Sequence, residues 1–357
     1  MILPTLRKQV HASPRVLSKA DLHLLLRRER VRSDRTGREF AYIVFQLDRS
    51  EARHGGIDAL TKTLQRRLRI TDDVSRLRHD RIGVVLTETN GAGAHQVAES
   101  ICNQYLEQFK SISHHVFVYP TVVDKDAEPA DDRFRLPSGS SSGRTSNDIQ
   151  PLEPMFLQKL PLWKRLIDIF GATVGLLVSA PLLFVAGLLI KFTSPGPLLF
   201  RQRRTGLGGK PFTIVKLRTM CVDAEAKKAV LCRFSEQDGP AFKMERDPRV
   251  TNVGRFLRRT CIDELPQLWN VLTGDMSLVG PRPLPCNESD ACRNWQRRRL
   301  DVTPGLTCDW QVNGGRRVTF AEWMRMDIRY IKARTFMQDV KLLWKTAIAV
   351  LFRRASC

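Results

Sequence analysis

The segment RRTCIDELPQLWNVLTGDMSLVGPRP, residues 258–283, places two neighbouring carboxylates in a strongly basic setting. Asp263 and Glu264 come shortly after Arg255, Arg258 and Arg259. Adjacent side chains on a helix point about 100° apart, so these two acids are not expected to share a proton. They suit two different tasks on one phosphate group.

The composition of the surrounding half of the chain limits the chemistry further. From Thr193 to the C-terminus there are 30 Lys and Arg against 16 Asp and Glu, which accounts for +14 of the net charge of +21. Such an excess implies a polyanionic partner: a nucleic acid, an anionic bilayer or a phosphorylated substrate. All seven histidines lie at or before His115, so His-based catalytic triads are excluded from this half. The eight cysteines form no C-x-x-C pair, which argues against a zinc site.

A helix is expected to position the acid pair. Proline is tolerated only in a first helical turn, so Pro266 places the helix start near Asp263. The spacing then predicts a buried stripe of Leu265, Leu268, Trp269 and Leu272. The free N–H groups and positive dipole at a helix start can bind phosphate. On spacing alone, Asp263 could instead be a simple helix cap.

Residues 169–190, IFGATVGLLVSAPLLFVAGLLI, form an uncharged stretch of 22 residues, about the length of a membrane-spanning helix. Basic residues flank it on both sides: Lys164, Arg165, Lys191, Arg201, Arg203 and Arg204. The positive-inside rule would keep both ends in the cytoplasm. We therefore predict a re-entrant helix that breaks at Ser179-Ala180-Pro181 and returns to the same face, with a kinked ordinary span as the alternative.

The C-terminal segment 339–354 also has the pattern of a membrane-associated helix. Its apolar residues stand at 340, 343, 344, 347, 348 and 351, with Lys and Arg at the edges. This pattern predicts an interfacial helix, and a core helix would fit nearly as well.

The N-terminal part, residues 16–123, is predicted to be an α/β domain. Residues 39–48 and 81–88 have the pattern of buried strands, and IDALTKTLQRRLR and GAHQVAESICNQYLEQF have helical apolar spacing. The order resembles a GGDEF domain, but the signature turn is replaced by Arg78-His79-Asp80-Arg81-Ile82. We expect a degenerate, regulatory or scaffolding domain, for which a nucleotide effector and a homodimer both stay open. Residues 1–15 are expected to be a tail, and the Asp-, Pro-, Ser- and Gly-rich residues 124–160 a flexible linker.

Three blocks in the C-terminal half carry a second, more specific resemblance. Residues 243–283, KMERDPRVTNVGRFLRRTCIDELPQLWNVLTGDMSLVGPRP, the apolar segment and residues 302–314, VTPGLTCDWQVNG, occur in one order over about 160–355. Together they resemble the bacterial sugar transferase family of monotopic phosphoglycosyl transferases. The resemblance implies a re-entrant membrane helix at 161–193 and a mostly α catalytic domain at 194–357 with amphipathic interfacial helices.

The resemblance also implies roles for individual residues. Asp263 would be the nucleophile that forms a covalent phosphosugar intermediate, and Glu264 would bind Mg²⁺. Arg258 is expected to contact phosphate, unless it is a surface helix charge. Arg282 is expected to lie near the nucleotide in a corner that Pro281 helps to shape. Further candidates are Lys216 and Arg218, which could equally decorate a strand, and Arg316, which follows a Gly315 where many members have arginine.

The expected function is the transfer of a sugar 1-phosphate from a UDP-sugar to a polyprenyl (undecaprenyl) phosphate with release of UMP. This would be the first step of exopolysaccharide, capsule or O-antigen assembly, with Mg²⁺ as cofactor, at the cytoplasmic face of a bacterial inner membrane. The alternative is a membrane-anchored regulatory scaffold, which would have no need of the acid pair. A nucleic-acid partner is not expected, because the sequence offers no aromatic–basic stacking platform.

Overall fold

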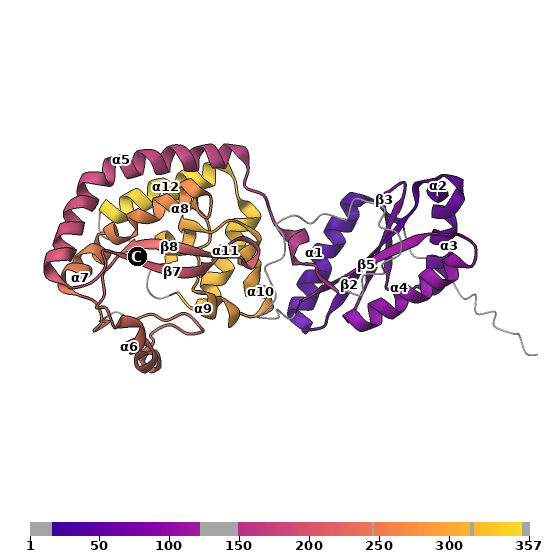
Figure 1. The fold of residues 1–357 in the computed structure, drawn as a ribbon, viewed down its shortest axis with the longest axis horizontal. Coiled ribbons are helices and arrows are strands. Elements are labelled where there is room, and N and C mark those ends of the chain that lie inside the picture. The colour runs from indigo at the N-terminus through magenta and orange to yellow at the C-terminus, as the bar shows by residue number, and fades with distance from the viewer. Residues whose placement is uncertain (1–15, 122–148, 245, 315–317, 352–357) are drawn as a thin grey trace, which may run out of the picture. The chain divides into compact units, whose positions relative to one another are not determined.

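The structure is a computed structural model that describes residues 16–121, 149–244, 246–314 and 318–351. The chain divides into two compact units, Met1–Phe156 and Leu157–Cys357. Each unit is described by itself below (Figure 1).

The first unit is built on a sheet of six strands in the order β1-β3-β4-β2-β5-β6. The strands are β1 (Val16–Leu17), β2 (Phe40–Leu47), β3 (Asp73–Arg78), β4 (Arg81–Leu86), β5 (Ile112–Tyr119) and β6 (Gln150–Pro151). The helices are α1 (Lys19–Thr36), the short α2 (Arg49–Glu51), α3 (Ile57–Arg67) and α4 (Gly91–Leu106), with a π-helical turn at Ala52–Gly56 and a 3-10 turn at Glu153–Phe156. The predicted α/β domain, with strands near 39–48 and 81–88, is confirmed.

Helices cover both faces of this sheet, so the central strand β2 is buried on both sides. Ile43 and Phe45 face a core that includes residues of α3 and α4. Tyr42 and Val44 face the opposite core, to which α1 contributes Leu22 and Leu26. Because neighbouring residues of a strand point to opposite faces, a strand covered on both sides is apolar throughout.

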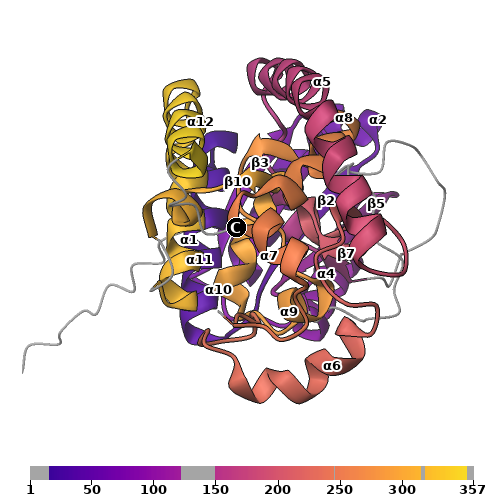
Figure 2. The same ribbon diagram turned by 90° about the vertical axis from the view of Figure 1, so that its left-hand side faces the viewer.

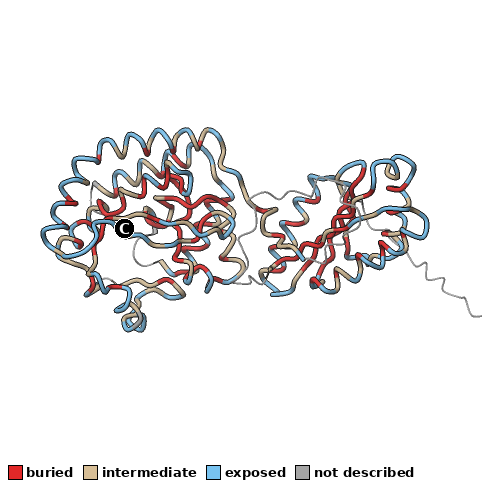
Figure 3. Tube along the Cα trace, viewed as in Figure 1, coloured by how far each residue is buried: buried red, intermediate tan, exposed pale blue. Residues whose placement is uncertain are grey.

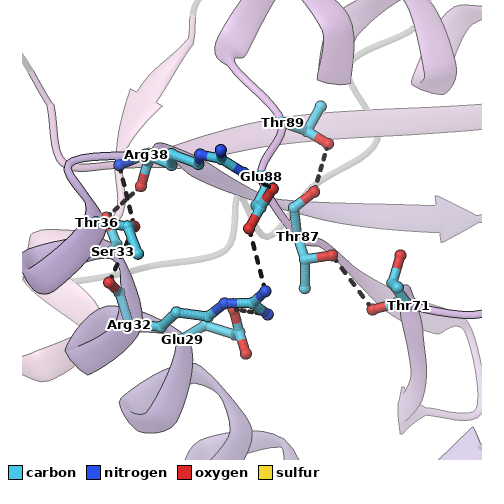
Figure 4. A network of polar contacts seen from close by, with 9 residues as sticks. All are labelled: Glu29, Arg32, Ser33, Thr36, Arg38, Thr71, Thr87, Glu88 and Thr89. Carbon is cyan, nitrogen blue, oxygen red and sulfur yellow. Dashed lines mark hydrogen bonds and ion pairs between the residues drawn. The ribbon is translucent and has the colours of Figure 1, made fainter.

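A polar network attaches α1 to the end of β4 (Figure 4). Glu88 accepts a hydrogen bond from Arg32 at 3.1 Å and forms an ion pair with Arg38, while Ser33 Oγ donates to the Arg38 carbonyl at 2.6 Å. These exposed ion pairs add little stability individually. They fix the turn that leads from α1 into β2.

The predicted linker is too long at its C-terminal end. Residues 150–151 form β6, which pairs in parallel with β5, and Leu152 is fully buried against the sheet. The Arg30 guanidinium lies 4.3 Å from the centre of the Phe156 ring. These residues therefore belong to the first unit, because two apolar side chains anchor a segment that looks polar in composition. Residues 1–15 and most of the predicted linker lie outside the described residues.

The second unit is mostly helical, as predicted. Its helices are α5 (Leu162–Thr193), α6 (Ala224–Leu231), α7 (Asn252–Arg259), α8 (Leu268–Thr273), α9 (Cys286–Asp290), α10 (Asn294–Arg297), α11 (Phe320–Ala333) and α12 (Phe336–Leu351). Strands β7 (Leu199–Thr205) and β8 (Pro211–Leu217) form an antiparallel hairpin, and β9 (Ser277–Val279) pairs in parallel with β10 (Gly305–Thr307). Shorter turns lie at Leu207–Gly209, Cys232–Phe234, Ile262–Gln267, Arg298–Asp301 and Trp310–Gly314.

Helix α5 is a continuous helix of 32 residues, so the predicted break at Ser179 and Pro181 is corrected to a bend within one helix. Figures 1 and 2 both show α5 curving over the second unit. Pro181 removes one backbone donor without ending the helix, which is how proline commonly bends long helices. Ser179 Oγ makes a long contact of 3.4 Å with the Leu176 carbonyl.

Both halves of α5 pack on the same unit. Ala172, in the first half, joins a core with residues of α8 and β9, and Asp168 Oδ1 accepts hydrogen bonds from Leu278 N at 2.8 Å and Ser277 Oγ at 3.0 Å. Ala186 and Ile190, in the second half, join a second core beside α7. The opposite face of the helix is exposed and apolar (Figure 3). Among the described residues, α5 is the one helix long and apolar enough to cross a membrane.

Helix α12 also leaves an apolar face exposed, on the side that the spacing predicts. Trp344 is 69% exposed, and Val340 and Ile348 of the same face are exposed too. Leu342 and Ala349 are buried instead. This distribution favours the interfacial helix over the core helix.

Candidate active site

The acid pair lies in a tight turn between two helices. Helix α7 begins after Thr251, whose hydroxyl accepts from Gly254 N, and ends at Arg259. Cys261 then takes a left-handed conformation with φ of 55°, and the 3-10 helix Ile262–Gln267 carries both acids in its first turn. The predicted helix start near Asp263 is confirmed, although the first turn is 3-10 rather than α. Such a helix start leaves backbone donors free for a bound anion.

The predicted stripe behind the acids is only partly right. Leu268 is buried, and Leu265 and Leu272 are half-buried. Trp269 is 59% exposed, and Val271 takes the buried position. The change from a 3-10 helix to the α-helix at Leu268 alters the angle between successive residues, so a single 3.6-residue period places Trp269 wrongly.

Glu264 is buried between two cations that the sequence also singled out. Lys216, from β8, donates to Glu264 Oε1 at 2.6 Å. Arg282, from the corner after β9, donates to Oε2 at 3.0 Å and forms a closer contact with Oε1. Burial alone would raise the pKa of Glu264, but Arg282 and Lys216 hold it well below its ordinary value. Glu264 is therefore ionised at any physiological pH.

Asp263 has the opposite environment, although its side chain is equally buried. Its Oδ1 atom has no hydrogen-bond partner among the residues that the structure describes. Burial, and next the charge of Glu264, raise the pKa of Asp263 to about 6. A buried carboxylate oxygen that lacks a hydrogen bond keeps its electron pairs available for attack. Two neighbouring carboxyls whose pKa values are pushed apart are typical of sites where each has its own chemical role.

Arg258 lies on the last turn of α7, close enough to Asp263 to influence its titration. Its Nε atom donates to Thr219 Oγ1 at 2.9 Å. Burial lowers the pKa of Arg258, and the charge of Asp263 opposes that effect. Arg258 is therefore a half-buried cation beside the acid pair, and its hydrogen bond to Thr219 argues against a freely solvated surface charge.

The corner Gly280–Pro283 is held by close backbone contact between β9 and β10. Gly280 N donates to the Thr307 carbonyl at 3.0 Å, and Gly305 N donates to the Pro281 carbonyl at 2.9 Å. A side chain on Gly305 would bring its Cβ within 2.0 Å of Gly280 N. Glycine is required here because the two backbones touch. Pro281 thus shapes the corner, and Arg282 projects from it to Glu264.

Of the other predicted residues, Arg218 is not brought to the acid pair. Arg218 donates to the carbonyls of Pro195 at 2.5 Å and Ser194 at 2.8 Å, so it caps the end of α5. Arg316 lies outside the described residues. Conversely, sequence reasoning missed Arg204, which lies behind the corner and donates to the Pro283 carbonyl at 2.8 Å. Burial, and next Arg282, lower the pKa of Arg204 to about 10. Arg204 stands among other basic residues of one strand, and no sequence pattern distinguishes it from them.

The described protein side chains could supply only some of the ligands of a divalent cation at this site. The described residues contain no group of three or more His, Cys, Asp or Glu arranged to bind a metal ion. Asp263 offers the unpartnered Oδ1, whereas both oxygens of Glu264 contact cations. Mg²⁺ commonly binds through one or two carboxylates, with phosphate oxygens and water completing its shell. The residues present therefore fit Mg²⁺ together with a phosphorylated ligand.

Comparison with known proteins supports a single family for the second unit. The family model described as bacterial sugar transferase matches residues 159–353. The galactosyl transferase CpsE of Streptococcus agalactiae is 42% identical over 53% of this chain and 42% of its own length. A UDP-glucose:undecaprenyl-phosphate glucose-1-phosphate transferase of Caulobacter vibrioides is 44% identical over 57% of this chain and 75% of its own length. This chain thus spans less than half of the streptococcal relative.

The first unit was compared with solved structures. A DGC protein from Thermotoga maritima is 20% identical, with a TM-score of 0.27, over 30% of this chain and 83% of that chain. The GGDEF domain of PA1120 from Pseudomonas aeruginosa is 20% identical over 31% of this chain, with a TM-score of 0.25. Likenesses of this size give no basis for assigning the first unit an activity.

Proposed function

The chain belongs to the bacterial sugar transferase family, and on that premise we propose that it transfers a sugar 1-phosphate from a UDP-sugar to a polyprenyl phosphate, releasing UMP. The acceptor would be undecaprenyl phosphate, the lipid named for several relatives. One observation carries the proposal: two neighbouring buried acids have opposite environments. Glu264 is paired with two cations, whereas one oxygen of Asp263 has no partner among the described residues. A membrane scaffold would gain nothing from such a costly arrangement.

The proposed reaction has two steps. A carboxylate oxygen of Asp263 attacks the phosphorus that carries the sugar, the bond from that phosphorus to the bridging oxygen breaks, and UMP leaves with the electron pair. This gives a phosphosugar joined to Asp263 as an acyl phosphate. An oxygen of the lipid phosphate then attacks the same phosphorus and releases the Asp263 carboxylate, so the product is a lipid-linked sugar diphosphate.

The surrounding cations would bind and orient the donor. The charged groups of Lys216 and Arg282 both point at Glu264 and are largely shielded from water. A diphosphate can therefore replace Glu264 as their partner with little reorganisation. Arg258 supplies further positive charge beside Asp263. We propose that the diphosphate takes over the contacts of Lys216 and Arg282, and that Glu264 and the diphosphate would then hold Mg²⁺, which would neutralise charge on the leaving phosphate. Because burial raises the pKa of Asp263 only to about 6, its carboxyl group would be mostly ionised at neutral pH.

We propose that α5 is re-entrant and that the second unit lies on the cytoplasmic face of the inner membrane. A straight helix of 32 residues is about 48 Å long, enough to cross a bilayer. Crossing would leave its ends on opposite sides of a hydrocarbon core about 30 Å thick. Both halves of α5 instead pack on one unit, and the exposed apolar face runs along both of them. The apolar face of α12 would lie in the same interface.

The product fits the start of glycan assembly. Relatives include an exopolysaccharide production protein of Rhizobium meliloti and an undecaprenyl-phosphate galactose phosphotransferase of Salmonella typhimurium. We propose that this chain likewise begins a lipid-linked exopolysaccharide, capsule or O-antigen, because a sugar diphosphate on a polyprenyl carrier is a substrate for further glycosyl transfer.

UMP release tests the proposal directly. The full chain in nanodiscs would receive Mg²⁺, undecaprenyl phosphate and, in turn, UDP-glucose, UDP-galactose and their N-acetyl forms. We expect one donor to yield UMP and a lipid-linked sugar. Asp263→Asn should abolish both, and Asp275→Asn, an exposed carboxylate of the same segment, should leave the rate within about twofold. If no donor gives UMP, or if Asp263→Asn equals the wild type, the proposed function is wrong.

A further inference from the structure

Hydrogen bonds hold the backbone around Arg282 at four successive carbonyls, from Pro281 to Leu284. Each of the four carbonyls accepts a hydrogen bond from a different residue: Pro281 from Gly305 N at 2.9 Å, Arg282 from Arg299, Pro283 from Arg204 at 2.8 Å and Leu284 from Thr205 N at 3.0 Å. Two of the donors are guanidinium groups, of which that of Arg299 is buried and that of Arg204 is half-buried. Prolines on both sides of Arg282 fix their own φ angles, so little freedom is left in this backbone.

Arg299 is the donor that acts on Arg282 itself. It lies in the 3-10 turn Arg298–Asp301, and its side chain is only 3% exposed. Its Nε atom donates to Asp327 Oδ2 at 3.0 Å, and an NH2–Oδ2 contact of 2.9 Å completes a forked ion pair. The guanidinium also lies 5.5 Å from the centre of the Trp323 ring. Arg299 is thus held on two sides, by an acid and by an aromatic ring.

Asp327 is the residue that orients this guanidinium. It lies on α11, with a side chain 1% exposed. Asp327 accepts from the Nε–H and from one N–H of the NH2 group, so the other N–H of NH2 is directed at the Arg282 carbonyl. A buried ion pair that served only the packing of α11 would not need this third contact. The rigid planar guanidinium fixes the two contacts relative to each other, which the freely rotating ammonium of a lysine would not do.

We propose that Arg299, oriented by Asp327, is a positioning residue that fixes the backbone of Arg282 and so directs its guanidinium at the donor diphosphate. This inference rests on the proposed function, in which Arg282 binds that diphosphate. Arg299 itself touches no substrate in this scheme. Arg299 would act on the donor site only through its hydrogen bond to the Arg282 carbonyl, so its effect should depend on the Arg282 side chain.

A double-mutant cycle on the affinity for UDP tests the inference without requiring turnover. The full chain in nanodiscs would be titrated with UDP and Mg²⁺ by calorimetry as wild type, Arg299→Gln, Arg282→Ala and the double variant. Hydrogen bonds to charged groups are worth enough to change binding constants about tenfold or more. We expect Arg299→Gln to weaken UDP binding about tenfold in the wild-type background, and less than twofold when Arg282 is already alanine.

Two further variants keep the result interpretable. Asp327→Asn, which nearly preserves shape, should weaken UDP binding several-fold in the same Arg282-dependent way if Arg299→Gln does not fold. Arg165→Gln is a matched control, because Arg165 also donates to two backbone carbonyls, Val271 at 2.6 Å and Leu272 at 2.7 Å, but away from the corner. It should lower the unfolding temperature and leave the affinity for UDP unchanged.

An equal loss of UDP affinity in both backgrounds, or no loss in either, would overturn the inference. Either result would mean that Arg299 and Asp327 serve only the fold. Absence of UMP release in the wild type would instead contradict the proposed reaction, and the binding cycle would still decide the role of Arg299. The two failures are therefore distinguishable.

Discussion

Replacement of Gly254 by alanine should destabilise the second unit, although alanine normally favours helices. Gly254 lies in the first turn of α7, which carries Arg258. Alanine is preferred over glycine inside a helix by about 1 kcal/mol. Here, however, an added Cβ would stand 2.1 Å from the Thr219 carbonyl oxygen, whereas ordinary contacts begin near 3.4 Å. The neighbour is backbone rather than a flexible side chain, so α7 must move by about 1 Å or more.

That movement has a cost that outweighs the helical preference. Overpacking of a filled site costs about 1–3 kcal/mol. The Thr219 carbonyl also accepts from Thr251 N at 3.0 Å, and the Thr219 hydroxyl accepts from Arg258 Nε at 2.9 Å. Displacement of α7 weakens both hydrogen bonds. We expect a net loss of about 1–2 kcal/mol, a fall of roughly 5 °C in unfolding temperature, and UMP release slowed about tenfold as Arg258 leaves its place.

The assay combines thermal unfolding with UMP release for the same nanodisc preparation. Gly187→Ala in α5 is the matched control, because its Cβ would meet only the flexible end of Leu198, at 3.3 Å. That variant should keep the rate and should not lower the unfolding temperature, because alanine is preferred over glycine inside a helix. An unfolding temperature for Gly254→Ala equal to or above that of the wild type would refute the steric argument. Lost stability with an unchanged rate would refute the link to Arg258.

Three further predictions follow from charge and exposure. Burial raises the pKa of Asp327 from 3.8 to about 6, although the charge of Arg299 opposes this effect. Between pH 4 and 6 the folded state therefore binds more protons than the unfolded chain. The free energy of unfolding should fall by about 3 kcal/mol as the pH rises through this window. Asp327→Asn should remove that slope in unfolding temperature against pH, and an unchanged slope would contradict the assignment. Glu264→Gln leaves Lys216 and Arg282 without a carboxylate and should lower the free energy of unfolding by about 3–5 kcal/mol. UDP without Mg²⁺ should therefore raise the unfolding temperature more in this variant than in the wild type, and an equal or smaller rise would count against a shared diphosphate site. Brominated lipids should quench Trp344, which is 69% exposed, so Trp344→Phe should lose part of the quenching; an identical quenching curve would place α12 outside the membrane interface.

The location of the candidate site could be predicted because most of its residues lie in one short segment, whereas the roles given to Asp263 and Glu264 came from the family resemblance. The acid pair, Arg258 and the Gly-Pro-Arg-Pro corner lie within 26 residues of one another, and the structure brings Arg282 onto Glu264. The structure also brings Lys216 to the pair, whereas no pattern in the sequence distinguished Lys216 from Arg218. The two residues are separated by one position in the sequence, but β8 ends at Leu217, so Arg218 leaves the strand and turns to the end of α5.

The errors have specific physical causes. Pro181 was expected to end a helix, but a proline removes only one donor and a long apolar helix continues around it. Residues 150–156 look like linker, yet two buried apolar side chains dock them on the sheet of the first unit. Arg204, Arg299 and Asp327 were missed because their partners are distant backbone carbonyls and side chains, which leave no pattern in the local sequence.

The central claim is that Asp263 carries the phosphosugar, and intact-protein mass spectrometry tests it most directly. The full chain in nanodiscs would be incubated with Mg²⁺ and the active UDP-sugar, without lipid acceptor, and quenched in acid. We predict a mass increase of one sugar phosphate that maps to Asp263 and disappears when undecaprenyl phosphate is added, and no increase in Asp263→Asn. An adduct on another residue, or UMP formed only when both substrates are present and without any adduct, would contradict a covalent intermediate at Asp263.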